Sequence, residues 1–104
     1  MKKKEKKDKG VEAIRSALSP YLGAHPKAKL DVYRKNPVSI RVRIVDPDFA
    51  KVTKGQRHDD IWSFLEPLPE ELLSELSLLL LLTPEESTKS IANLDFDHPL
   101  PSAI

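Results

Sequence analysis

The sequence predicts an α+β domain in which a three-stranded mixed sheet carries helices mainly on one face. Three observations lead to this fold class. Apolar and polar residues alternate strictly along residues 39–45, as they do in a half-buried strand. A leucine-rich run without charge, residues 76–82, has the length of a strand buried on both faces, and helix signals flank it. Two capping-box patterns, at Thr53 and Thr83, mark places where helices begin.

The predicted elements follow the chain in the order helix, strand, strand, helix, short helix, strand, helix. Apolar residues spaced three and four apart between Val11 and Leu22 predict the first helix. Pro67 and Pro69 separate the second helix from the short one that follows it. The predicted ranges are helix 11–23, strands 30–34 and 39–45, helix 54–66, short helix 69–74, strand 76–82 and a helix that begins after Thr83.

The connections determine how the predicted strands pair. A short turn at residues 34–37 joins the first two strands into an antiparallel hairpin. Two helices lie between the second and third strands, so these strands are parallel if they pair, and the crossover is right-handed. Within the second strand, Arg41 and Arg43 face away from the apolar side.

A chain of 104 residues has room for one compact domain. Residues 1–10 contain six lysines and two acidic residues, a composition typical of a disordered, solvated tail. Residues 11–92 are predicted to form a single α+β domain. Residues 93–104 contain two prolines among apolar residues, and we expect an extended C-terminal arm there.

Composition also argues against several classes of protein. The chain has no cysteine, which excludes disulfides and thiolate ligands within it. Its three histidines are not at metal-ligand spacing, so we expect neither a zinc site nor a cofactor. The leucine run is too short for a membrane span, and Glu12 and Arg15 interrupt the segment that a signal peptide would need to be apolar. A soluble, cytoplasmic protein without a membrane partner is therefore predicted.

A series of short motifs in a fixed order resembles the BolA family, whose fold is similar to that of the type II KH domain. The resemblance covers roughly residues 11–90 and includes the closing sequence LSLLLLLTPEE. Its motif positions are Phe49, Thr53, Arg57, His58, Thr83 and Pro84. The resemblance implies a small regulatory protein that pairs with a monothiol glutaredoxin.

The same resemblance implies a shared [2Fe-2S] cluster. The family holds it through a histidine at the start of the last strand and through a histidine or cysteine in the loop between the first two strands. Residues 74–77 and 34–38 occupy these places here, and neither segment contains histidine or cysteine. We therefore expect no cluster ligation by this chain itself.

Two groups of residues have the composition of chemical sites. His58, next to Asp59 and Asp60, has the composition of a proton-transfer group. Its helical spacing from Ile61 instead favours a histidine at the margin of the core that donates to a backbone carbonyl. Asp46 and Asp48 are either cation ligands or the acids of a turn around Pro47, and the turn is favoured. No nucleophile and base are paired by local spacing, so we predict that the protein is not an enzyme.

The leucine run predicts an interaction surface on the side of the sheet away from the helices. If residues 78, 80 and 82 face the helices, Leu79 and Leu81 lie on the other face with Arg41 and Arg43. The C-terminal arm, a second copy in a dimer or a different protein could cover this face.

The sequence thus predicts a non-enzymatic domain for protein interaction or regulation. The alternative is a KH-like module that binds nucleic acid through Arg41, Arg43 and other basic residues. These other positions are Lys2, Lys3, Lys4, Arg34 and Lys35.

Overall fold

The computed structural model describes residues 8–98. In chain order its elements are α1 (Lys9–Ala24), β1 (Lys29–Asn36), β2 (Ser39–Val45), the 3-10 helix η1 (Pro47–Lys51), α2 (Lys54–Leu65), α3 (Glu70–Leu73), β3 (Leu76–Leu82), α4 (Pro84–Ser87) and α5 (Ile91–Asp97). No helix among these residues is both long enough and apolar enough to span a bilayer.

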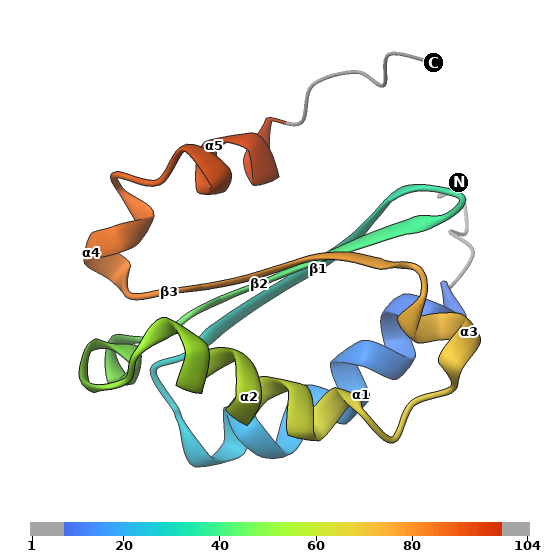
Figure 1. Ribbon diagram of the computed structural model, residues 1–104, viewed down its shortest axis with the longest axis horizontal. Helices are drawn as coiled ribbons and strands as arrows, with labels where there is room; N and C mark the ends of the chain where they lie inside the picture. Colours follow the sequence, from blue (N-terminus) through green and yellow to red (C-terminus); the bar gives the residue numbers. More distant parts are fainter. Residues whose placement is uncertain (1–7, 99–104) are drawn as a thin grey trace, which may run out of the picture.

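The three strands form one sheet in the order β1-β2-β3. β1 and β2 are antiparallel, whereas β2 and β3 are parallel. The helices α1 and α2 cover one face of the sheet, and α5 lies on the opposite side (Figure 1). The α+β fold class and the mixed three-stranded sheet predicted from the sequence are confirmed.

The first helix illustrates how local sequence determines an element. The Asp8 side chain accepts a hydrogen bond from the Val11 amide at 3.1 Å and so caps the helix N-terminus. Pro20 lies inside the helix and has no amide hydrogen to offer the Ser16 carbonyl. The Ser19 hydroxyl donates to that carbonyl at 2.9 Å instead, which allows the helix to continue to Ala24.

The hydrophobic core lies between the sheet and the pair α1 and α2. Central strand β2 contributes its apolar side, and each helix contributes a buried stripe with a spacing of four residues. The fully buried members of this core are Ile14, Leu18, Ile40, Val42, Ile44, Ile61 and Leu65.

The predicted facing of β3 is wrong. In the parallel register Val42 pairs with Leu79 and Ile44 pairs with Leu81, so these leucines lie on the core face. Leu81 belongs to the core, and Leu79 packs against it. A run of identical apolar residues gives no contrast between the two faces, and a register irregularity occurs where β3 begins. The sequence pattern therefore could not determine which leucines face the helices.

The structure also differs from the sequence prediction at the two ends of the domain. Residues 93–97 were expected to be extended, but they belong to α5, which Ser90 caps by accepting from the Asn93 amide at 3.0 Å. The prolines of the predicted arm come after this helix, where proline is common. Residues 99–104 and residues 1–7 of the predicted tail lie outside the described residues, and residues 8–10 cap and begin α1.

Substitutions in β3 test the corrected facing. We expect Leu81→Ala to lower the free energy of unfolding by about 2 to 4 kcal/mol, because it leaves a cavity in the core. Leu80→Ala, on the half-buried opposite face, should cost only about 1 kcal/mol. Urea denaturation of both variants measures the difference. Equal losses, or a larger loss for Leu80→Ala, would contradict this facing.

Candidate functional site

Several motif positions of the sequence, but not His58, come together around the Arg57 side chain. Arg57 is buried, and its guanidinium donates to the Val52 carbonyl at 3.0 Å and to the Leu81 carbonyl at 3.1 Å. It forms an ion pair with Glu86, with 2.7 Å between Nη1 and Oε1, and lies over the Phe49 ring. Arg57 therefore joins η1, α2, the end of β3 and the start of α4.

The helix start after β3 completes this cluster. The Thr83 hydroxyl accepts from the Glu86 amide, and the Glu86 carboxylate accepts from the Thr83 amide, each at 3.0 Å. The Arg57 hydrogen bonds and then the Thr83 amide lower the pKa of Glu86 to about 2. Thr53 caps α2 by accepting from the Gln56 amide at 3.2 Å, and Pro84 occupies the first turn of α4. In this structure these motif positions stabilise the fold.

His58 does not lie where the sequence predicted. The buried stripe of α2 consists of Arg57, Ile61 and Leu65, so His58 is rotated out of it. The His58 side chain is exposed, and its ring stacks on Trp62 with 5.9 Å between ring centroids. The predicted role at the core margin is therefore wrong.

Arg41 and Arg43 lie on the face of the sheet that α5 covers. The Arg41 guanidinium forms an ion pair with Asp95 at 2.9 Å. Arg43 forms ion pairs with Asp31 at 2.8 Å and with Asp97 at 2.9 Å. Each predicted interaction arginine is thus already paired with a carboxylate of the same chain.

An aromatic contact completes the docking of α5. The Phe96 side chain is buried against Tyr33, edge to face, with 5.0 Å between ring centroids. The Arg43 guanidinium lies 4.4 Å from the centroid of the Phe96 ring, and the Tyr33 hydroxyl donates to the Phe96 carbonyl at 2.8 Å. The C-terminal segment was one of three predicted covers for the outer face of the sheet. Its residues 91–97 do lie over that face, but as a helix and not as an extended arm. Ile91 and Leu94, 84% and 62% exposed, are large apolar residues of the same helix that remain in solvent.

The structure describes two of the other predicted basic contacts, Arg34 and Lys35. Arg34 forms an ion pair with Asp8, which caps α1. It forms a second ion pair with Glu75, the residue just before β3, with 3.0 Å between Nη2 and Oε1. These pairs occupy the place where the family resemblance expects cluster ligands. Lys35 lies in β1, and Lys2, Lys3 and Lys4 lie outside the described residues.

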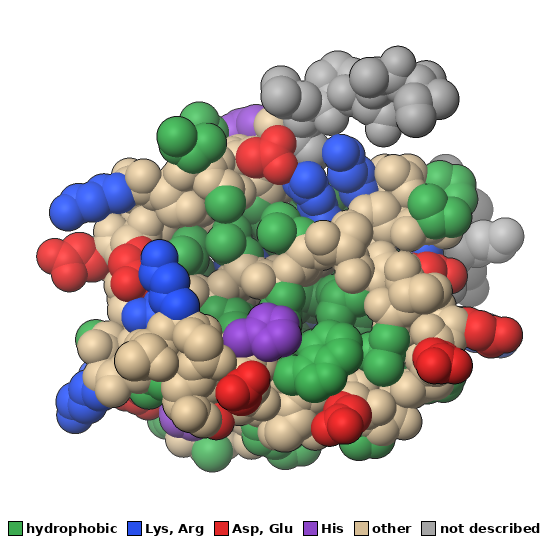
Figure 2. Space-filling view, viewed as in Figure 1, with side chains coloured by type: hydrophobic (Ala, Val, Ile, Leu, Met, Phe, Trp, Pro, Cys, Tyr) green, Lys and Arg blue, Asp and Glu red, His purple; other side chains and the backbone are tan. Residues whose placement is uncertain are grey.

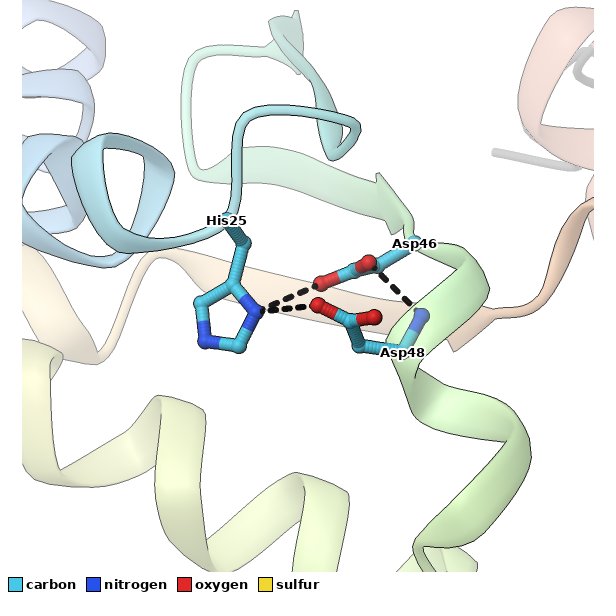
Figure 3. A group of neighbouring side chains, drawn as sticks. All are labelled: His25, Asp46 and Asp48. Atoms are coloured by element: carbon cyan, nitrogen blue, oxygen red, sulfur yellow. Dashed lines mark hydrogen bonds and ion pairs between the residues drawn. The ribbon is translucent and has the colours of Figure 1, made fainter.

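A second group of polar side chains lies where α1 and β2 end. Nδ1 of His25 is 2.8 Å from Oδ2 of Asp48 and 3.4 Å from Oδ2 of Asp46 (Figure 3). The ligand atoms of these three residues all lie within 4.8 Å of one another. Asp46 is fully buried, and its other oxygen accepts from the Asp48 amide at 2.9 Å, which begins η1. The turn predicted around Pro47 is thus this 3-10 helix, and His25 is an addition that the sequence did not indicate.

The buried Tyr21 supports this group. Its hydroxyl donates to the Asp46 carboxylate, and its ring stacks on His25 with 4.0 Å between ring centroids. Burial, followed by the hydrogen bond to Asp46, raises the pKa of Tyr21, so the phenol remains a hydrogen-bond donor. Local sequence patterns do not reveal this cluster, because His25 and Asp48 are 23 positions apart in the chain, with β1 and β2 between them. The only local signals were a histidine after a helix and two acids around a proline.

Comparisons with known proteins address the fold. No protein-family model matches the sequence, and no curated protein does. Among solved structures, BolA1 from Arabidopsis thaliana is similar, with a TM-score of 0.54 and 20% identity. The alignment covers 77% of this chain and 98% of that protein. The chain therefore has a BolA-like fold, as the motif resemblance predicted.

The low pKa of Glu86 gives a pH test of the Arg57 cluster. Because the folded-state pKa lies below the ordinary value of 4.5, the ion pair stabilises the fold above about pH 4.5. This contribution, about 1 to 2 kcal/mol after solvent screening, should disappear as the pH falls from 4.5 towards 2. Urea denaturation across this range should show a flatter profile for Glu86→Gln than for the control Glu85→Gln. Identical pH profiles for the two variants would contradict the assignment.

The docking of α5 is tested by hydrogen exchange. Phe96→Ala removes the buried ring that holds α5 on the sheet, so the α5 amides should exchange at least about tenfold faster. The amides of β2 should keep their protection, because the core lies on the opposite face. Leu94→Ala, at an exposed position of the same helix, is the matched control. Faster exchange in Leu94→Ala alone would count against the proposed anchor.

Proposed function

We propose that the chain is a small, non-catalytic domain that binds another protein through the open edge of β3 and the adjoining surface of α2. The observation that carries the proposal is an edge strand without a charged side chain over Leu76–Leu82. The BolA-like fold is compatible with a small regulatory domain of this kind.

The hydrogen bonds at the end of β3 distinguish its two edges. The Leu82 carbonyl accepts from the Asp46 amide on the β2 side, at 2.9 Å. The Leu81 carbonyl accepts from Arg57 of α2, on the side away from β2. Because main-chain groups alternate along a strand, Leu79 directs its amide and carbonyl away from β2 as well. Within residues 8–98, no hydrogen bond from another element reaches Leu79 on that side.

An uncharged edge of this kind is a template for pairing. Proteins usually protect open edges with lysine, proline or a covering segment, because the unpaired main-chain groups otherwise recruit another strand. Here Arg57 protects only the C-terminal end of the edge. An extended segment of a partner could therefore pair with β3 by adding a strand to the sheet.

The surface of α2 next to this edge offers an anchor for side chains. Trp62 is half-buried against the core and carries the exposed His58 ring on its face. Figure 2 shows hydrophobic side chains gathered at the centre of this side of the molecule, over the region where Figure 1 draws α2 and β3. Large aromatic side chains in such positions often contribute most of the binding energy of an interface.

A protein partner is favoured over nucleic acid by the state of the two arginines. Arg41 and Arg43 lie under α5 and are paired with its carboxylates, which a phosphate backbone would have to displace. The family resemblance makes a monothiol glutaredoxin the first partner to examine. Because residues 34–38 and 74–77 contain no histidine or cysteine, we propose that such binding needs no cluster ligand from this chain.

A lysine on the β3 edge tests the proposal. Ser77 is an exposed position of β3 whose hydroxyl also bonds to Ser39 of β2, so Ser77→Ala serves as the control for the loss of that bond. Ser77→Lys should weaken partner binding at least tenfold relative to Ser77→Ala, because the charge opposes strand pairing. Ser16→Lys, at an exposed position of α1, should bind like the unmodified chain. Isothermal titration with a monothiol glutaredoxin and sedimentation of the chain alone measure binding to a partner and to a second copy.

Other outcomes would contradict the proposal. Association that Ser77→Lys leaves unchanged would place the interface elsewhere. Absence of any protein association, together with RNA binding that weakens steeply with salt and is lost when Arg41 and Arg43 are neutralised, would support the nucleic-acid alternative.

A further inference from the structure

We infer that His25, Asp46 and Asp48 form a binding site for a first-row divalent metal ion, of which Zn²⁺ is the best match. This site lies at the C-terminal ends of α1 and β2 and does not depend on the proposed β3 interface. Three arguments support it: the separation of the ligand atoms, the charge of the buried carboxylate and the way the ligands are held.

One ligand separation equals that of a tetrahedral metal site, and all three lie within 4.8 Å. A tetrahedral ion with ligand bonds of about 2.0 to 2.1 Å holds its ligand atoms roughly 3.3 to 3.4 Å apart. The distance between Nδ1 of His25 and Oδ2 of Asp46 is 3.4 Å. The shorter distance of 2.8 Å from Nδ1 to Asp48 is that of a hydrogen bond, which a bound ion would replace with a small outward movement of Asp48. Asp48 is 65% exposed and free to make this movement.

The charge at the site needs a counterion. Asp46 has no exposed surface, and a buried carboxylate is costly unless a positive group accompanies it. Within residues 8–98, no lysine or arginine nitrogen lies within 4.0 Å of Asp46. A divalent ion would balance both carboxylates while the His25 imidazole remained free to coordinate it.

The ligands are already held in position. The Asp46 carboxylate accepts from the Tyr21 hydroxyl and from the Asp48 amide, which fixes its orientation. The His25 backbone amide donates to the carbonyls of the last turn of α1, and its ring is stacked on Tyr21. Hydrogen bonds and packing that orient ligands from behind are typical of metal sites, because they lower the cost of bringing the ligands together.

The ligand set indicates the class of metal. One imidazole nitrogen with two carboxylate oxygens suits zinc and neighbouring first-row ions, whereas Mg²⁺ and Ca²⁺ prefer oxygen ligands alone. The His25 side chain is 31% exposed, so the site is open to solvent on one side. Water could therefore complete the coordination, as it does in open zinc sites.

The test is titration of the full chain with Zn²⁺, Mn²⁺ and Mg²⁺ salts. We expect saturable binding of one Zn²⁺ per chain, weaker binding of Mn²⁺ and no saturation by Mg²⁺ at the same concentrations. His25→Gln and Asp48→Asn should each weaken Zn²⁺ binding at least tenfold. Their matched controls, His58→Gln and Asp59→Asn, alter an exposed histidine and an exposed acid of α2 and should bind like the unmodified chain.

Two further measurements keep the result decisive. Co²⁺ bound at the site should give visible absorption bands that Asp48→Asn removes, and circular dichroism confirms that each variant is folded. If His25→Gln unfolds, Asp48→Asn decides the matter, because its side chain is mostly exposed. Ser77→Lys should bind Zn²⁺ normally, so failure of the β3 interface and failure of the metal site are distinguishable. Absence of saturable Zn²⁺ binding, or equal losses in the His58→Gln and Asp59→Asn controls, would overturn the inference.

Discussion

The ion pair between Arg57 and Glu86 is the interaction on which the arrangement of this fold depends. The parallel pairing of β2 and β3 requires a long crossover connection. After the two helices of this crossover, the chain must be held beside β2 so that β3 can pair with it. The guanidinium fixes the crossover at both ends, since it bonds to Val52 just before α2 and to Leu81 near the end of β3. Burying a guanidinium is unfavourable unless its donors are satisfied, and here two carbonyls, the Glu86 carboxylate and the Phe49 ring satisfy it.

The same cluster influences which surfaces remain available for binding. Arg57 occupies the outward carbonyl of Leu81 and thereby closes the C-terminal end of the β3 edge. On the outer face of the sheet, α5 neutralises Arg41 and Arg43 through its own carboxylates. These two arginines are thus engaged within the chain, while among residues 8–98 the edge of β3 from Leu76 to Leu80 has no comparable cover. This distribution of charge is the physical reason for favouring a protein partner over nucleic acid.

Much of the fold could be predicted because its elements are signalled locally. Alternation identified β2, and the capping patterns at Thr53 and Thr83 located the starts of two helices. The facing of β3 could not be predicted, because a run of leucines looks the same on both faces. Among the motif positions, the capping roles of Thr53 and Thr83 were predicted correctly, the ion pair between Arg57 and Glu86 was not predicted, and His58 is exposed where a position at the core margin was expected. The cluster around His25 depends on a contact between residues distant in sequence, which no local pattern encodes.

Asp46 connects the inferred metal site with the β2–β3 ladder. Its carboxylate belongs to the site, whereas its backbone amide donates to the Leu82 carbonyl at the end of β3. An ion that immobilises the Asp46 side chain would therefore also hold the last hydrogen bond of the parallel ladder. The neighbouring residue, Leu81, is the one whose carbonyl Arg57 holds from the opposite edge. The C-terminal end of β3 is thus restrained from both sides, so any strand added to this sheet must pair nearer its N-terminal end, at Ser77 and Leu79.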